Sequence, residues 1–202
     1  VLEPLHDGVA LRFARRALTI PAVGLGLVTV IATLPVLLAL AVTVDVVRRS
    51  RSASTVRLLA FGVCFFITES VGIAMLFGVF LATLFRESRR EALTVKVQRV
   101  YTAMHWWFVQ AVYHVHGEVE GGELAASGPM IVMVRHVSLV DVLVPGVFIA
   151  NPHRIALRYA LKRELLWLPC LDIAGHWIRN HFVARGGVDT AGDVAGVRAL
   201  KT

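Results

Sequence analysis

Two long apolar runs dominate the N-terminal half of the chain. Residues 20–44 contain no charged side chain, and a helix of that length is roughly 37 Å long, enough to cross a hydrocarbon core of about 30 Å. The second run, residues 58–85, is interrupted by Glu69 alone. Its apolar side chains supply roughly 5 to 10 kcal/mol of insertion energy, more than the about 3 kcal/mol cost of one central charge. The pattern predicts membrane spans at about residues 20–46 and 58–85.

Two alternatives to a spanning pair follow from the same pattern. The first run could be a cleaved signal peptide, although its apolar stretch is longer than the ~7 to 15 residues of such peptides and lacks a small-residue cleavage site. Both runs could also lie as a shallow hairpin in one leaflet. The spanning hairpin is the interpretation that the length of both runs favours.

After the second run the period of the pattern changes. Apolar residues at helical spacing predict a helix over residues 93–111, either packed in a core or lying at the membrane interface with Trp106, Trp107 and Phe108 at the headgroups. Short apolar runs separated by turn residues follow. They predict strands at 112–119, 130–134, 154–161 and 176–184, and helices at 137–149 and 162–167.

This alternation of strands and helices predicts an α/β domain with a mostly parallel sheet. The chain is therefore divided into a two-helix membrane hairpin with basic flanks, residues 1–92, and an α/β domain, residues 93–202.

The distribution of charge agrees with this division. Residues 1–102 carry 12 Lys and Arg against 6 Asp and Glu, whereas residues 103–202 carry 9 against 8, so most of the net charge of +7 flanks the apolar runs. Basic residues there indicate contact with anionic lipid headgroups and argue against nucleic acid as a partner. Eight basic residues flank the ends of the hairpin and four lie in its turn. The positive-inside rule therefore predicts that the following domain faces the cytoplasm.

Several residues could bind a metal or form a disulfide by their chemistry, but their spacing in the sequence does not indicate such a site. Cys64 and Cys170 have no disulfide or metal spacing, and His114 and His116 have no third ligand at a useful spacing, so the sequence predicts no metal site. No glycine-rich phosphate loop is present, and no tightly bound cofactor is expected. Glu69 is either functional or hydrogen-bonded within the hairpin.

Residues 135–141, Arg-His-Val-Ser-Leu-Val-Asp, combine side chains that could act in catalysis, and they lie where a predicted strand ends and a helix begins. On one continuous helix His136 and Asp141 would point about 140° apart, so they can meet only if His136 lies on the turn. Asp141 could then bond one imidazole nitrogen and leave the other for a substrate, as a general base requires. Alternatively, Ser138 and Asp141 form a capping box that satisfies free amides at the helix start.

The same stretch resembles the first motif of the 1-acylglycerol-3-phosphate acyltransferase family. His136, Ser138 and Asp141 match that motif, in which four residues separate His from Asp, and Arg135 replaces the usual Asn. The resemblance also covers the two apolar runs at the start of the chain and the aromatic helix after them.

Further resemblance lies downstream. Residues 162–165, Lys-Arg-Glu-Leu, with Pro169 and Gly175 after them, are similar to the family's Lys-x-Glu-Leu segment. Residues 182–185, Phe-Val-Ala-Arg, are similar to its second block, Gly-x-Ile-Phe-Ile-Asp-Arg. That block departs from the family at Arg179, His181 and Ala184, and keeps Phe182 and Arg185.

The resemblance implies transfer of a fatty acyl group from a thioester, on coenzyme A or acyl carrier protein, to the free hydroxyl of a lysophosphatidate in phospholipid synthesis. It implies that His136 is the general base, that Asp141 orients it, and that Arg185 and Ser138 belong to the substrate-binding site. The expected partners are membrane lipids, the acyl thioester and the lysophospholipid acceptor.

One departure qualifies this expectation. The family's third block, Glu-Gly-Thr-Arg, does not occur before the chain ends at Thr202, so the domain is expected to be truncated, and an in-frame block of that kind beyond Thr202 would favour the enzyme. The alternatives are an acyltransferase for another lysolipid or glycolipid acceptor, and a catalytically inactive membrane protein that acts by binding others.

Overall fold

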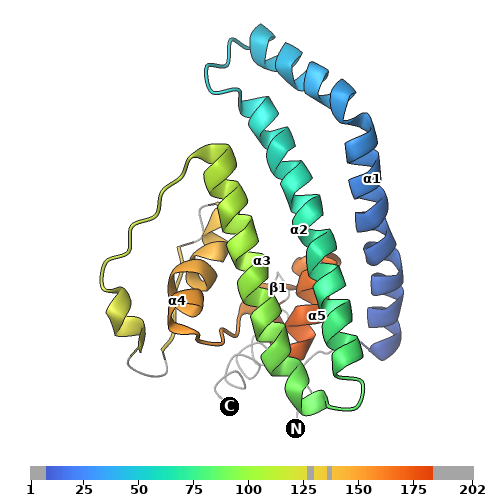
Figure 1. Cartoon of the computed structure of the whole chain (residues 1–202), viewed down its shortest axis with the longest axis vertical. Helices are drawn as coiled ribbons and strands as arrows, with labels where there is room; N and C mark the ends of the chain where they lie inside the picture. Colours follow the sequence, from blue (N-terminus) through green and yellow to red (C-terminus); the bar gives the residue numbers. More distant parts are fainter. Residues whose placement is uncertain (1–7, 127–129, 136–137, 184–202) are drawn as a thin grey trace. The chain divides into compact units, whose positions relative to one another are not determined.

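The computed structural model describes residues 8–126, 130–135 and 138–183, and this part of the chain is mostly helical (Figure 1). The long helices are α1 (Val9–Val47), α2 (Ser54–Ala82) and α3 (Arg90–Tyr113). The shorter elements are a 3-10 turn at Glu87–Arg89, a 3-10 helix at Gly122–Ala126, a 3-10 helix at Leu139–Leu143, a π-helix at Pro145–Ala150, α4 (Asn151–His153), β1 (Ala160–Lys162), a 3-10 helix at Arg163–Trp167, α5 (Pro169–Trp177) and β2 (His181–Val183).

Helices α1 and α2 are long and apolar enough to cross a membrane. This confirms the predicted pair of long apolar helices, although α1 starts well before residue 20. Large apolar side chains of both helices are exposed on the protein surface. Examples are Leu25, Val28, Ile31 and Val36 on α1, and Leu58, Phe77 and Leu81 on α2.

The described chain forms two compact units, and each of the three long helices contributes to both of them. The first unit contains residues 8–22, 72–97 and 158–183, and the second contains the described residues among 23–71 and 98–157.

In the second unit, α1 and α2 are joined by a tight turn that Asp45 organises. Its carboxylate accepts hydrogen bonds from the backbone N–H of Thr55 at 3.0 and 3.1 Å and from that of Val56 at 3.1 Å. These amides belong to the first turn of α2 and have no partner within that helix.

Along the same pair of helices, a Cβ atom on Gly26 would lie 2.5 Å from the ring of Phe66, so only glycine permits this close approach.

Also in the second unit, α2 and α3 meet along a seam of aromatic and polar side chains. The α2 residues are spaced four apart and so lie on one face of that helix. They are Phe61, Phe65 and Glu69, and the residues that face them from α3 are Tyr113, His105 and Tyr101. The Tyr101 hydroxyl donates to the carboxylate of Glu69, which is fully buried. A buried carboxylate needs hydrogen-bond donors, and Tyr101 supplies one of them to Glu69.

The segment after Ser138 is helical, as predicted, but it is broken into 3-10, π and α turns. The N–H of Val144 donates to Asp141 O, which is the bond of a 3-10 turn. Pro145 follows and has no N–H to donate, so the helix cannot continue regularly through it. The turns pack on α3 through Gly146, where an added Cβ would lie 2.9 Å from Thr102, and through Asn151, whose Nδ2 donates to Arg99 O at 3.3 Å.

The predicted sheet forms only in part. In the first unit, β1 and β2 pair in parallel with Leu161 opposite Phe182, so the prediction of parallel pairing is confirmed for these two strands. The predicted strand at 154–161 shrinks to β1, and of the strand predicted at 176–184 the structure places only 181–183 in a strand, because residues 176 and 177 end α5.

The strands predicted at 112–119 and 130–134 are wrong. Helix α3 continues through Tyr113 and ends where His114 adopts a left-handed φ of 56°. Residues 114–119 and 130–135 then run without regular structure, and Ile131 and Met133 are 83% and 92% exposed. A strand is stable only when a neighbour accepts and donates its backbone hydrogen bonds, and among the described residues no neighbour does so here.

Candidate functional site

The structure describes two of the four predicted site residues. Ser138 and Asp141 lie at the start of the 3-10 helix Leu139–Leu143. His136 and Arg185, predicted as the general base and the phosphate ligand, lie outside the described residues. The pairing of His136 with Asp141 and the role of Arg185 therefore stay predictions.

Ser138 and Asp141 form the capping box that their spacing predicts. The backbone N–H of Ser138 donates to Asp141 Oδ2 at 2.7 Å, and the hydroxyl of Ser138 donates to Asp141 Oδ1 at 3.2 Å. The same hydroxyl accepts from the N–H of Val140 at 3.2 Å. Together these bonds hold the Asp141 carboxylate against the turn from which the chain enters the helix.

The capping box is compatible with the proposed dyad. A carboxylate offers about four lone-pair sites, so the two bonds from Ser138 do not exclude a further donor to Asp141. The dyad requires Asp141 in the first helical turn, and the structure places it there. Capping by itself therefore does not decide between a structural and a catalytic Asp141.

The downstream residues that match the family pattern act in packing. Pro169 begins α5, where its missing N–H leaves no helical bond unmade. Gly175 lies directly under the ring of Phe182, because an added Cβ would be 2.5 Å from that ring. His176 stacks on the same ring, with centroids 5.7 Å apart. Gly175 and His176 thus dock α5 on β2 through the ring of Phe182.

A cluster that the sequence did not indicate lies in the first unit, around Asp172 of α5. This carboxylate is fully buried, and Arg15 and Arg16 of α1 each donate to it at 2.8 Å. Nδ1 of His176 lies 3.1 Å from it. Burial alone would raise the pKa of Asp172, but the bonds from His176, Arg16 and Arg15 hold that pKa well below its usual range.

Sequence reasoning missed this cluster for a definable reason. The basic residues before the first apolar run were interpreted together as contacts to lipid headgroups, and Asp172 stands alone in an apolar segment. A single acid among apolar residues signals a buried partner, but the sequence does not show where that partner is.

Other polar contacts of the first unit hold the beginning of α3. The guanidinium of Arg90 lies over the ring of Trp177, 5.4 Å from its centroid, and Nη2 of Arg158 lies 3.3 Å from Glu91 Oε1. Burial raises the pKa of Tyr159 to about 12.

In the second unit, the seam between α2 and α3 holds the remaining titratable groups of interest. Glu69 receives its hydrogen bond from α3, which agrees with the structural alternative for this residue but places the donor on a third helix. Nδ1 of His105 lies 3.1 Å from Tyr101 O, so the proton of the neutral ring sits on Nδ1. Burial lowers the pKa of His105, which favours that neutral form.

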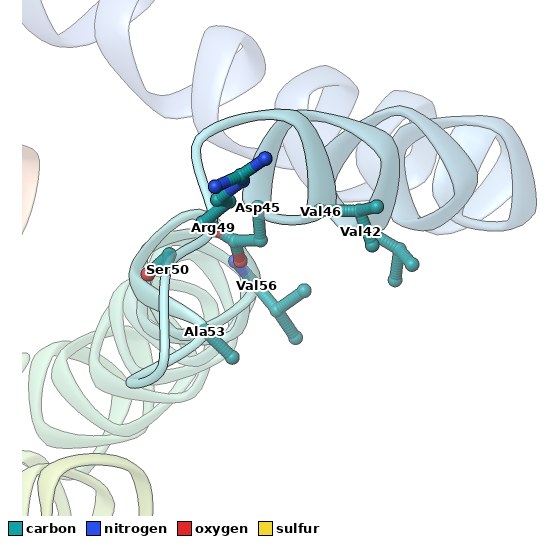
Figure 2. A pocket seen from close by; sticks show the side chains of 7 residues that line it. All are labelled: Val42, Asp45, Val46, Arg49, Ser50, Ala53 and Val56. Carbon is teal, nitrogen blue, oxygen red and sulfur yellow. The ribbon is translucent and has the colours of Figure 1, made fainter.

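No metal centre is evident in the described ranges, where no three His, Cys, Asp or Glu side chains come together. His114 and His116 lie exposed in the irregular segment after α3. A pocket of about 290 Å³ lies at the turn between α1 and α2 (Figure 2), and its lining is mostly apolar. Its carboxylate, Asp45, is already bonded to the start of α2, so the pocket offers little chemistry.

Comparison with protein families, curated proteins and solved structures finds no match to this chain. The candidate site therefore rests on its own residues and geometry.

Proposed function

We propose that the chain is a membrane-bound acyltransferase that transfers a fatty acyl group from an acyl thioester to the free hydroxyl of a lysophosphatidate. The observation that carries the proposal is the position of Asp141, whose carboxylate the capping box fixes in the first turn after the segment that holds His136. From that position an acid five residues after a histidine can orient the imidazole ring when the histidine lies on the preceding turn. The resemblance of residues 135–141 and 182–185 to the acyltransferase motifs supports the same conclusion.

The membrane part of the proposal rests on α1 and α2. Both helices are long and apolar enough to cross a bilayer, and their exposed leucine, valine and phenylalanine side chains would be costly in water. We assign these surfaces to lipid, with the domain that follows on the cytoplasmic side. An enzyme anchored in this way would meet its lysophosphatidate acceptor in the membrane and its thioester donor in the cytoplasm.

In the proposed reaction, His136 removes the proton of the acceptor hydroxyl while the oxygen attacks the thioester carbonyl. Asp141 holds the imidazole in the required tautomer and stabilises the imidazolium that forms. The tetrahedral intermediate then breaks its carbon–sulfur bond, and the leaving thiolate takes the proton from His136. The products are phosphatidate and the free thiol of the donor. Arg185 pairs with the acceptor phosphate, for which a planar guanidinium is suited.

The experiment measures phosphatidate formation by membranes that carry the protein expressed from its complete gene, with acyl-coenzyme A and lysophosphatidate as substrates. His136→Ala is expected to lower kcat by roughly 10²- to 10⁴-fold, the contribution of a general base. Other lysolipids assayed in parallel identify the acceptor. Parental activity of His136→Ala would contradict the proposal, and activity only with a different lysolipid would change the acceptor.

A matched pair of variants separates catalysis from capping. Ser138→Ala removes the serine side of the capping box, which costs about 0.5 to 2 kcal/mol of stability but leaves the Asp141 charge in place. Asp141→Asn keeps the shape and one capping oxygen but removes the charge. If Asp141 orients His136, Asp141→Asn lowers kcat, whereas Ser138→Ala keeps kcat per folded molecule, and any lost substrate contact of Ser138 appears as a higher KM. Equal, small effects of both variants would reduce Asp141 to a cap.

A further inference from the structure

The N-terminal turns of α1 carry an arginine, Arg12, that makes no polar contact with the residues that the structure describes. Among the described residues the guanidinium of Arg12 has no hydrogen bond or ion pair, and its Nε atom is buried without a partner. Unsatisfied buried donors are rare in folded proteins and cost about 1 to 3 kcal/mol. The described part of the chain therefore leaves Arg12 able to bind a ligand.

Arg16 stands one helical turn beyond Arg12, on the same face of α1. Its position is fixed, because its Nε donates to Asp172 Oδ2 at 2.8 Å and its Nη2 lies 3.5 Å from both Asp172 O and Oδ1. Like charges four residues apart on a helix repel each other. An anion bound between the two guanidinium groups would remove that repulsion and satisfy Arg12.

The surroundings of Arg12 indicate what carries the anion. Leu11 and Phe13 project about 100° to either side of Arg12 around the helix, and they are 54% and 69% exposed. An anion in water gains nothing from two exposed apolar neighbours, whereas a phospholipid can place its phosphate on the arginines and its acyl chains along Leu11 and Phe13.

The position along α1 fits the same ligand. Arg12 lies about 12 Å before residue 20, where the predicted membrane span begins, and Arg16 lies about 6 Å before it. Those heights correspond to the headgroup region that borders the hydrocarbon core.

We propose that Arg12 and Arg16 form a binding site for the phosphate of an anionic membrane phospholipid, seated on the Asp172 cluster that orders Arg16. The site is independent of acyl transfer, since it uses none of the residues assigned to that reaction. Asp172 positions Arg16 and does not itself contact the lipid. The site ties the entry of α1 into the membrane to α5 in the same unit.

The test measures thermal unfolding of the full chain in nonionic detergent as a lipid is titrated into the micelles. Phosphatidylglycerol is expected to raise the melting temperature in a saturable way, and phosphatidylcholine is not. Arg12→Gln should weaken the apparent affinity for phosphatidylglycerol by roughly ten- to a hundredfold, the value of one charge-assisted bond to phosphate. Because Arg12 makes no bond within the described chain, this variant should fold normally without lipid.

Arg51→Gln is the matched control. Arg51 is exposed in the turn between α1 and α2, and its substitution removes the same charge at a different place. It should bind phosphatidylglycerol like the parent. An unchanged affinity of Arg12→Gln, or an equal loss in Arg51→Gln, would overturn the site. Stabilisation by inorganic phosphate alone would show a site for free phosphate instead, and equal stabilisation by phosphatidylcholine would show a site without preference for anionic lipid.

Discussion

Nε of Arg16 donates a 2.8 Å hydrogen bond to Oδ2 of Asp172, a residue 156 positions further along the chain. Nη2 of Arg15 donates to the other carboxylate oxygen at the same distance. The two bonds join the first turns of α1 to α5 inside the first unit. An apolar helix with a membrane-like composition is thus connected through one buried acid to α5.

Asp172→Asn is expected to destabilise the protein by about 3 to 5 kcal/mol, because it removes the negative charge to which the buried Arg15 and the neighbouring Arg16 are bonded. The loss should appear in denaturant unfolding of the protein in detergent. Glu164→Gln is the control, since Glu164 is exposed and should change stability by less than about 0.5 kcal/mol. Equal stability of both variants would mean that the cluster contributes no net stability.

The same cluster predicts a dependence of stability on pH. The pKa of Asp172 is lower in the folded protein than its ordinary value of 3.8, so the folded state favours the ionised carboxylate. This contribution is complete above pH 3.8 and is lost as the pH falls below 3.8 toward the lowered folded pKa. The difference in unfolding free energy between the parent and Asp172→Asn should therefore shrink below pH 3.8. A difference that stays constant down to pH 2 would argue against the ionised cluster.

Tyr101→Phe should cost about 1 to 3 kcal/mol, because it removes the donor to the buried carboxylate of Glu69 and keeps the aromatic ring. Tyr113→Phe is matched to it on the same helix and the same seam. Within the described chain no hydrogen bond is recorded for the Tyr113 hydroxyl, so its removal should change stability by less than about 0.5 kcal/mol. Thermal melting in detergent compares the two, and equal losses would contradict a specific role for the bond.

Asp45→Ala should destabilise the hairpin by about 0.5 to 2 kcal/mol, since the amides of Thr55 and Val56 lose their acceptor. Asp45→Asn keeps one oxygen and should lose less. Thr43→Ala removes an exposed hydroxyl from the same helix and should be nearly neutral. If Thr43→Ala loses as much stability as Asp45→Ala, the loss does not come from the hydrogen bonds of Asp45 to the turn, and the assigned role of Asp45 is wrong.

Alkaline carbonate extraction of membranes tests the assignment of α1 and α2 to lipid. Two helices with exposed apolar surfaces should keep the protein in the membrane pellet. Release into the supernatant would mean that these surfaces are covered by protein. A peripheral protein extracted alongside provides the control for complete stripping.

The sequence by itself determined the features that depend on local pattern. Long uncharged runs predicted α1 and α2, because apolar length is a property of consecutive residues. The capping box at Ser138 and Asp141 followed from a spacing of three residues within one turn. The helix over residues 93–111 was also predicted, and it extends to 90–113.

The tertiary structure decided everything that requires a distant partner. Residues 112–119 and 130–134 have apolar runs typical of strands, but such a run forms a strand only if another segment pairs with it. Among the described residues, only β1 and β2 pair. Asp172 and Glu69 looked like isolated acids until Arg16 and Tyr101 were placed beside them. A buried charge is stable only when a partner contacts it. The sequence does not show that Arg16 meets Asp172 across 156 positions or that Tyr101 meets Glu69 across 32.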